Sequence, residues 1–194
     1  VIVGVQQLCD VLVQLFGKTQ DVLFRICGGD GIRCARDVDP YLVAMLYAGD
    51  RKDASEIIQN WLRQNKIVLL DRYTYSNIAY QCAKIAEVSA RNKLMDWILS
   101  LEFEHFEIPR PDLNIFLDVP FSFTEKKLSD IRTGEDRTYL NGTGDIHEES
   151  LDFQKKVREL YLEVAQKDEH LSVIDCSNNI GEMLSPEKIF TKVT

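Results

Sequence analysis

Two charged residues that directly follow an apolar run are the strongest candidates for chemistry in this sequence. Residues 67–70 are Ile-Val-Leu-Leu, and Asp71 and Arg72 come next. A planar guanidinium can hold a phosphate group through two parallel hydrogen bonds. We therefore expect Arg72 to bind a phosphate. The simpler alternative is a local ion pair between Asp71 and Arg72.

Four polar or aromatic side chains follow that turn, on a helix expected to begin near residue 76. They are Ser76, Asn77, Tyr80 and Gln81. Residues spaced by four lie on one face of an α-helix, so these side chains form one surface beside the turn. Such groups suit the base and sugar of a nucleotide. Together with Arg72 they predict a site for a nucleoside monophosphate.

Tyr47 and Arg51 form a second candidate pair, because residues four apart share a helical face. Tyr47 can stack on a base while Arg51 reaches the phosphate. The alternatives are a core aromatic for Tyr47 and a solvated charge for Arg51.

Strands and helices alternate along the chain, and they must position these residues. Apolar runs at 67–70 and 114–119 are typical of central parallel strands covered on both faces. Further strands are expected at 1–3, 20–25 and 171–175. The pattern predicts an α/β fold: a central parallel five-stranded sheet with helices on both faces, in one domain over 1–194.

The helices between these strands have recognisable starts. Asp39 suits the N-cap and Pro40 the first position of a helix that ends near residue 47 or 50. Ser55 suits the cap of another helix, which runs to about residue 65. Further helices are expected at 5–16, 76–87, 92–103, 122–129, 148–169 and 185–193.

Charged residues close three of the expected strands. They are Arg25, Asp71 with Arg72, and Asp118. In open parallel sheets, ligands bind beyond the carboxyl ends of the strands. We therefore expect the ligand site at this edge.

Four segments, in their order and spacing, resemble the thymidylate kinases, which are P-loop enzymes that phosphorylate dTMP to dTDP with ATP and Mg²⁺. The segments are YLVAMLYAGDRKDA, KIVLLDRYTYSNIAYQ, IPRPDLNIFLDVP, and the tail ESLDFQKKVRELYLEVA with LSVIDCS. They extend from about residue 40 to the C-terminus. The resemblance implies a P-loop NTPase-like fold and a homodimer.

The resemblance also implies roles for the residues described above. Arg51 and Arg72 would bind the dTMP phosphate, Arg25 would reach the same phosphate, and Tyr47 would stack on thymine. The nucleoside pocket would be lined by Ser76, Asn77, Tyr80 and Gln81.

The polar stretch 130–145 resembles the short mobile lid of this family. Arg132 and Arg137 would then be lid arginines that close on the transferring phosphoryl group, whose charge needs fixed cations. The alternative is a solvated loop. Asp71 either helps to hold Mg²⁺ or orients Arg72, so the expected catalytic set is Arg72 and Asp71 with these two lid residues.

The phosphate-binding loop of the family is missing from this sequence. Such kinases place GxxxxGKS/T between the first strand and helix, but here Val3 is followed by Gly4-Val5-Gln6. The stretch 25–39 is also short. Either this sequence omits residues that the protein contains, or the deletions are real, so no ATP-binding residue is assigned.

Two alternatives to dTMP phosphorylation stay open. If the deletions are real, the protein is a catalytically inactive relative that binds a nucleotide or serves as a dimeric scaffold. If catalysis is kept, the substrate could be another nucleoside or deoxynucleoside monophosphate.

Composition limits the possible partners. The net charge of -8 argues against nucleic acid, because such binding depends on neutralising phosphates. The five cysteines are odd in number and without CxxC spacing, which indicates thiols rather than disulfides or zinc. No apolar run is long enough to span a membrane and no signal peptide is visible, so a cytoplasmic location is expected.

Overall fold

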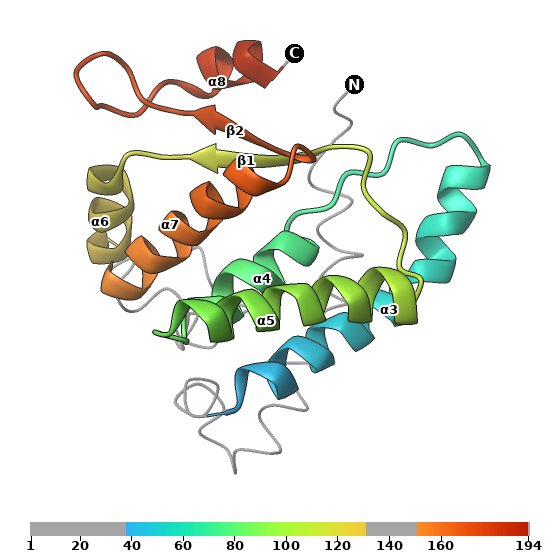
Figure 1. Cartoon of the computed structure of the whole chain (residues 1–194). Helices are drawn as coiled ribbons and strands as arrows, with labels where there is room; N and C mark the ends of the chain where they lie inside the picture. The colour runs from blue at the N-terminus through green and yellow to red at the C-terminus, as the bar shows by residue number, and fades with distance from the viewer. Residues whose placement is uncertain (1–37, 131–150, 194) are drawn as a thin grey trace. The chain divides into compact units, whose positions relative to one another are not determined.

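A computed structural model describes residues 38–130 and 151–193 of the chain, without the side chains of 127–130. The described residues belong to two compact units, one ending at Arg110 and the other beginning at Pro111. Figure 1 shows helices α3, α4 and α5 in the first unit, and strands β1 and β2 with helices α6, α7 and α8 in the second.

Helix α3 (Pro40–Arg63) begins as predicted. Asp39 is its N-cap, and Asp39 Oδ1 accepts a hydrogen bond of 2.8 Å from the backbone N–H of Tyr41. The prediction of two helices here is wrong, because α3 is continuous through residues 50–55. Ser55 does not cap a helix. Its hydroxyl donates to the carbonyl of Arg51, one turn earlier, at 2.9 Å. A serine inside a helix commonly satisfies its hydroxyl in this way.

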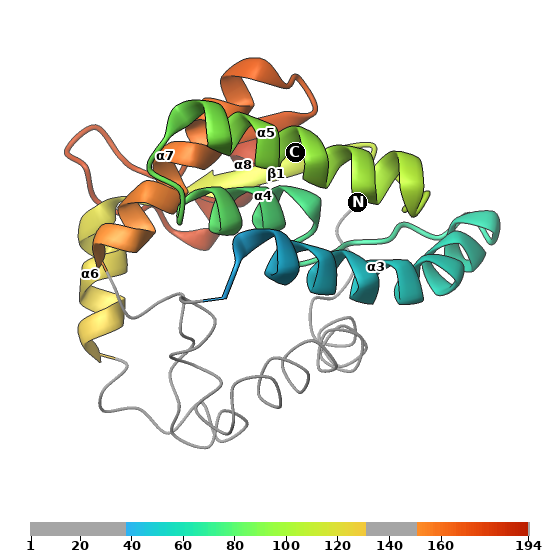
Figure 2. The ribbon, with the colours of Figure 1, turned by 60° about the horizontal axis from the view of Figure 1, so that its bottom comes forward.

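Helices α4 (Thr74–Cys82) and α5 (Val88–Ser100) pack with α3 and lie side by side in Figure 2. The predicted helix 76–87 is thus shorter and begins two residues earlier. A new helix starts at residue 88 because the Glu87 carboxylate accepts from the N–H groups of Ser89 and Ala90. Fully buried apolar side chains, Val43, Ile78, Leu94 and Ile98, fill the space between the helices.

A π-helical turn, η1 (Leu101–His105), extends α5. The N–H of Phe106 donates to the carbonyl of Leu101, five residues earlier, at 2.9 Å. Glu107 has a left-handed φ of 51°, and the next N–H, of Ile108, donates to the carbonyl of Glu102. This pattern ends the helix and satisfies its last carbonyls.

In the second unit, β1 (Asn114–Asp118) and β2 (Leu171–Asp175) confirm two predicted strands and their parallel pairing. Asp118 pairs in register with Asp175 at the carboxyl ends. Helix α7 (Leu151–Lys167) packs on this pair, and the Tyr161 ring stacks on Phe116 with centroids 4.3 Å apart. The unit also contains α6 (Phe121–Asp130) and α8 (Pro186–Val193).

The predicted central strand at 67–70 is not among the strands of the described residues. The segment has no regular secondary structure, and Ile67 is 60% exposed. An extended segment becomes a strand only when a neighbour accepts and donates its backbone hydrogen bonds. The sheet of the described residues consists of β1 and β2, and the strands expected at 1–3 and 20–25 lie outside the described ranges.

Three predicted site residues, Arg25, Arg132 and Arg137, also lie outside the described residues, as does most of the lid at 130–145. Within the described part, no helix is both long and apolar enough to cross a membrane.

Candidate functional site

Arg72 lies in the turn before α4 with its backbone in the left-handed region, at φ 63°. This conformation is uncommon for a residue with a side chain, and such residues cluster at functional sites. The guanidinium is exposed and faces Tyr80 on α4. Arg72 Nη2 donates to the Tyr80 hydroxyl at 3.2 Å, and Arg72 Cζ lies 5.0 Å from the ring centroid. The structure thus brings two of the predicted site residues together.

Asp71 is exposed in the same turn. No group of three or more His, Cys, Asp or Glu side chains with metal-site geometry occurs among the described residues. Mg²⁺ commonly uses only one or two carboxylates, with phosphate oxygens and water as its other ligands. A single carboxylate at this turn is therefore compatible with Mg²⁺ bound to a nucleotide.

Arg51 is buried, with an exposure of 3%, and is not the solvated charge of the alternative interpretation. It forms an ion pair with Glu102, which is fully buried. Arg51 Nε donates to Glu102 Oε2 at 2.7 Å and Arg51 Nη2 donates to Glu102 Oε1. The guanidinium also lies 5.9 Å from the ring centroid of Tyr73, next to Arg72. Tyr47, one turn before Arg51, is half-buried on α3.

The predictions missed Glu102. Besides the two bonds from Arg51, its carboxylate accepts 2.7 Å from the Thr74 hydroxyl and 3.0 Å from Asn77 Nδ2. A signal for it exists in the sequence. Leu94 and Ile98 are buried at a spacing of four, and the next residue in that series is the acidic Glu102. An acidic residue on the apolar face of a helix indicates a buried partner.

Asn77 is buried on α4, and its amide orientation is determined by its neighbours. Nδ2 donates to the backbone carbonyl of Ala44 at 2.9 Å and to the carboxylate of Glu102. Because both neighbours accept only, the amide nitrogen must face them. Among the described residues, Asn77 Oδ1 is the buried side-chain polar atom without a hydrogen-bond partner. It is an acceptor that requires a donor.

The other two members of the predicted α4 face differ in exposure from each other. Ser76 is partly exposed, whereas Gln81 is buried at 1% and its Oε1 accepts 2.8 Å from Lys84 Nζ. Burial lowers the pKa of Lys84 to about 8. Burial also raises the pKa of Tyr73, whose hydroxyl donates to the carbonyl of Pro109 at 3.0 Å. The residues of the predicted surface on α4 thus differ in exposure, with Ser76 and Tyr80 partly exposed and Asn77 and Gln81 buried.

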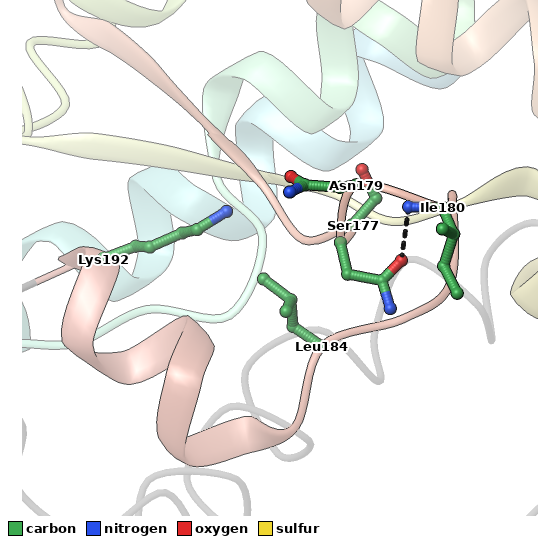
Figure 3. Close-up of a pocket in the computed structure, with 6 residues that line it drawn as sticks. Ser177, Asn179, Ile180, Leu184 and Lys192 are labelled. Carbon is green, nitrogen blue, oxygen red and sulfur yellow. Dashed lines mark hydrogen bonds between the residues drawn. The ribbon is translucent and has the colours of Figure 1, made fainter.

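In the second unit, Asp118 at the end of β1 forms an ion pair with Arg158 of α7. The guanidinium donates two hydrogen bonds to the carboxylate, and the one from Nη2 to Oδ2 is 2.7 Å long. This interaction raises the pKa of Arg158. Beyond the end of β2 lies an open pocket of about 380 Å³. Figure 3 shows it between the loop that carries Ser177 and Ile180 and the side chains of Leu184 and Lys192. The loop is held by a 3.1 Å hydrogen bond from the N–H of Ile180 to Asn178 Oδ1.

Comparison with known proteins gives one consistent family. The sequence pattern of the thymidylate kinase family matches residues 32–185. The chain is 29% identical to a probable thymidylate kinase of Thermococcus onnurineus, over 87% of this chain and 73% of that protein. It is 36% identical to a probable thymidylate kinase of Pyrobaculum aerophilum, over 75% and 65%. It is 30% identical to the thymidylate kinase of Mycobacterium tuberculosis, over 64% and 56%.

The structure is similar to a solved thymidylate kinase of Candida albicans, an enzyme described as having broad substrate specificity. The TM-score is 0.53 at 26% identity, and the match covers 80% of this chain and 65% of that one. Across these relatives the chain spans 56 to 73% of their length.

The described residues have parallel strands in a mixed α/β arrangement. The family match places the chain in the class of nucleotide-binding phosphotransferases. The chain belongs to the thymidylate kinase family. This confirms the predicted family and enzyme class.

Proposed function

We propose that this protein catalyses ATP-dependent phosphorylation of dTMP to dTDP, with Mg²⁺. One observation above all others supports the part of this proposal that concerns dTMP, the phosphate acceptor. Each of the two arginines expected to bind the phosphate is linked to an α4 side chain expected to bind the nucleoside. Arg72, in the turn before α4, contacts Tyr80, and Arg51, on α3, shares the carboxylate of Glu102 with Asn77.

In this proposal Arg72 and Arg51 bind the monophosphate, and Tyr47 stacks on the base. Arg25, Arg132 and Arg137 supply further positive charge to the phosphates. The acceptor is already an anion, so transfer requires positioning and neutralisation of charge rather than a strong general base.

The unpaired oxygen of Asn77 supports a particular base. Thymine and uracil carry a hydrogen on N3 and can donate to Asn77 Oδ1, whereas cytosine presents an acceptor at N3. A buried acceptor without a partner costs roughly 1–3 kcal/mol, which a donated N–H would relieve. The site therefore suits dTMP or dUMP better than dCMP.

The ATP half of the proposal has no residues of its own. Asp71 supplies one carboxylate in the same turn as Arg72. This is compatible with Mg²⁺, which commonly uses only one or two carboxylates. The sequence has no P-loop motif between Val3 and Gln6, so no residue is assigned to the ATP phosphates. A nucleotide-binding relative without activity is therefore the second candidate function. In either case we propose a homodimer.

A coupled assay tests this proposal with ATP, Mg²⁺ and, in turn, dTMP, dUMP, dCMP and dGMP. Turnover that is fastest with dTMP is expected. Binding of dTMP without turnover would favour the inactive relative. Neither binding nor turnover with any of the four would refute both functions.

A further inference from the structure

The proposed function assigns Glu102 no direct contact with the substrate. Glu102 lies in η1, has no exposed surface, and still contacts two of the proposed substrate-binding residues. Both of its oxygens accept two bonds from described residues: Oε1 from Arg51 and Asn77, and Oε2 from Arg51 and Thr74. One carboxylate therefore connects α3, α4 and η1.

Its contact with Arg51 determines which edge of the guanidinium is left for a ligand. Glu102 engages Nε and Nη2 in a paired, planar arrangement. Such a fork restricts rotation of the guanidinium, which a long side chain otherwise retains. The Nη1 side is then the side that can serve a nucleotide.

Its contact with Asn77 determines which amide atom is left for a ligand. Because Glu102 and the carbonyl of Ala44 both require donors, Asn77 must present Nδ2 to them and Oδ1 elsewhere. An amide in place of the carboxylate would remove this requirement.

The π-helical turn supplies the backbone that delivers this carboxylate. π-turns are rare and frequent at functional sites. Here the turn is tied to α3 by Lys52, whose Nζ donates to the carbonyl of Phe106 at 2.6 Å. The carboxylate is thus held from both sides, by its own turn and by its four donors.

We infer that Glu102 is the positioning residue of the acceptor site: it orients Arg51 and Asn77 so that an arginine edge and an amide oxygen face the nucleotide. The inference rests on the proposed function and adds to it a residue that determines specificity without touching the substrate.

Glu102→Gln is the informative change, because it keeps the shape of the side chain and places an NH₂ group opposite donors. Equilibrium binding of dTMP and dCMP to the full chain is measured by calorimetry. We expect dTMP to bind about tenfold more weakly, and the ratio of the dCMP and dTMP dissociation constants to fall toward one. Glu104→Gln is the matched control, since Glu104 is exposed in the same turn and contacts Ser100. It should leave both constants unchanged.

The ratio separates positioning from a purely structural role. Partial unfolding weakens the apparent binding of every ligand by the same factor, which leaves the ratio unchanged. An unchanged ratio in folded Glu102→Gln overturns the inference, whether or not the two constants rise together. If that variant does not fold, Thr74→Val removes one donor without a change of charge, and a ratio within about twofold of wild type overturns the inference.

Binding to the wild-type protein distinguishes failure of the proposed function from failure of the role inferred for Glu102. If it binds no dTMP, the proposed function fails and the inference fails with it. If it binds dTMP with preference over dCMP, and Glu102→Gln does the same, only the role of Glu102 is refuted.

Discussion

The guanidinium of Arg72 lies over the ring of Tyr80, with Cζ 5.0 Å from the ring centroid, and donates to the Tyr80 hydroxyl at 3.2 Å. Arg72 belongs to the turn before α4 and Tyr80 to the second turn of that helix. The contact therefore directs an exposed arginine along the face of α4 where we propose that the nucleotide binds.

Tyr80→Phe should weaken dTMP binding severalfold. The change keeps the ring under Arg72 but removes the hydroxyl, and a hydrogen bond of this kind contributes about 1 kcal/mol. Tyr80→Ala should weaken binding further, because the cation–π contact is also lost. Calorimetric titration measures both. Tyr41→Phe is the control, since the Tyr41 ring packs on Trp97 with centroids 5.0 Å apart. If the two Phe variants bind equally well, Tyr80 has no role.

Arg51→Ala and Glu102→Ala should each lower the free energy of unfolding by about 3–5 kcal/mol, because each leaves a buried charge without its partner. The double change Arg51→Met with Glu102→Leu should recover part of this stability, since no unpaired charge remains. It should not recover dTMP binding. Urea unfolding and calorimetry measure the two quantities separately. Wild-type affinity in the folded double variant would show that Arg51 does not bind the nucleotide.

The stability of the protein should rise with pH above about 8 because of Lys84. Burial lowers the pKa of Lys84 in the folded state from 10.5 to about 8. Between these values the unfolded chain holds more protons than the folded chain, so the free energy of unfolding increases with pH. The gain between pH 8 and the unfolded-state pKa is on the order of 3 kcal/mol, because each pKa unit corresponds to about 1.4 kcal/mol.

Urea unfolding of wild type and Lys84→Met, below and above pH 8, measures this contribution. The rise should be smaller in the variant, which has no amine to deprotonate. Parallel pH dependences of the two proteins would assign the rise to other groups.

The sequence predicted the elements whose signals are local. Asp39 and Pro40 mark the start of α3, and the apolar runs at β1 and β2 mark two strands. It did not predict that α3 continues through Gly49 and Ser55. A residue that often caps a helix can also lie inside one, as Ser55 does when its hydroxyl donates to a carbonyl of the preceding turn. The strand predicted at 67–70 depends on neighbours that periodicity cannot supply.

For the candidate site, too, the sequence predicted what local signals indicate and did not predict the contacts between distant segments. Sequence order assigned Arg72 and Tyr80 to one site, because Arg72 lies in the turn before α4 and Tyr80 in the second turn of that helix. Their direct contact is seen only in the structure. Glu102 could not be placed this way, since it reaches Arg51 across 51 residues of sequence. Spacing along one helix indicates that Glu102 is buried, but only the packing of α3, α4 and η1 shows its partners.

The central claim, that Arg72 binds the monophosphate of dTMP, is tested most directly by comparing dTMP with thymidine. Their affinities for wild type and Arg72→Ala are measured by calorimetry. The two ligands differ only in the phosphate, so wild type should prefer dTMP strongly. In Arg72→Ala most of this preference should be lost, with thymidine bound as before. An unchanged preference for dTMP in Arg72→Ala would contradict the assignment of this turn as the phosphate site.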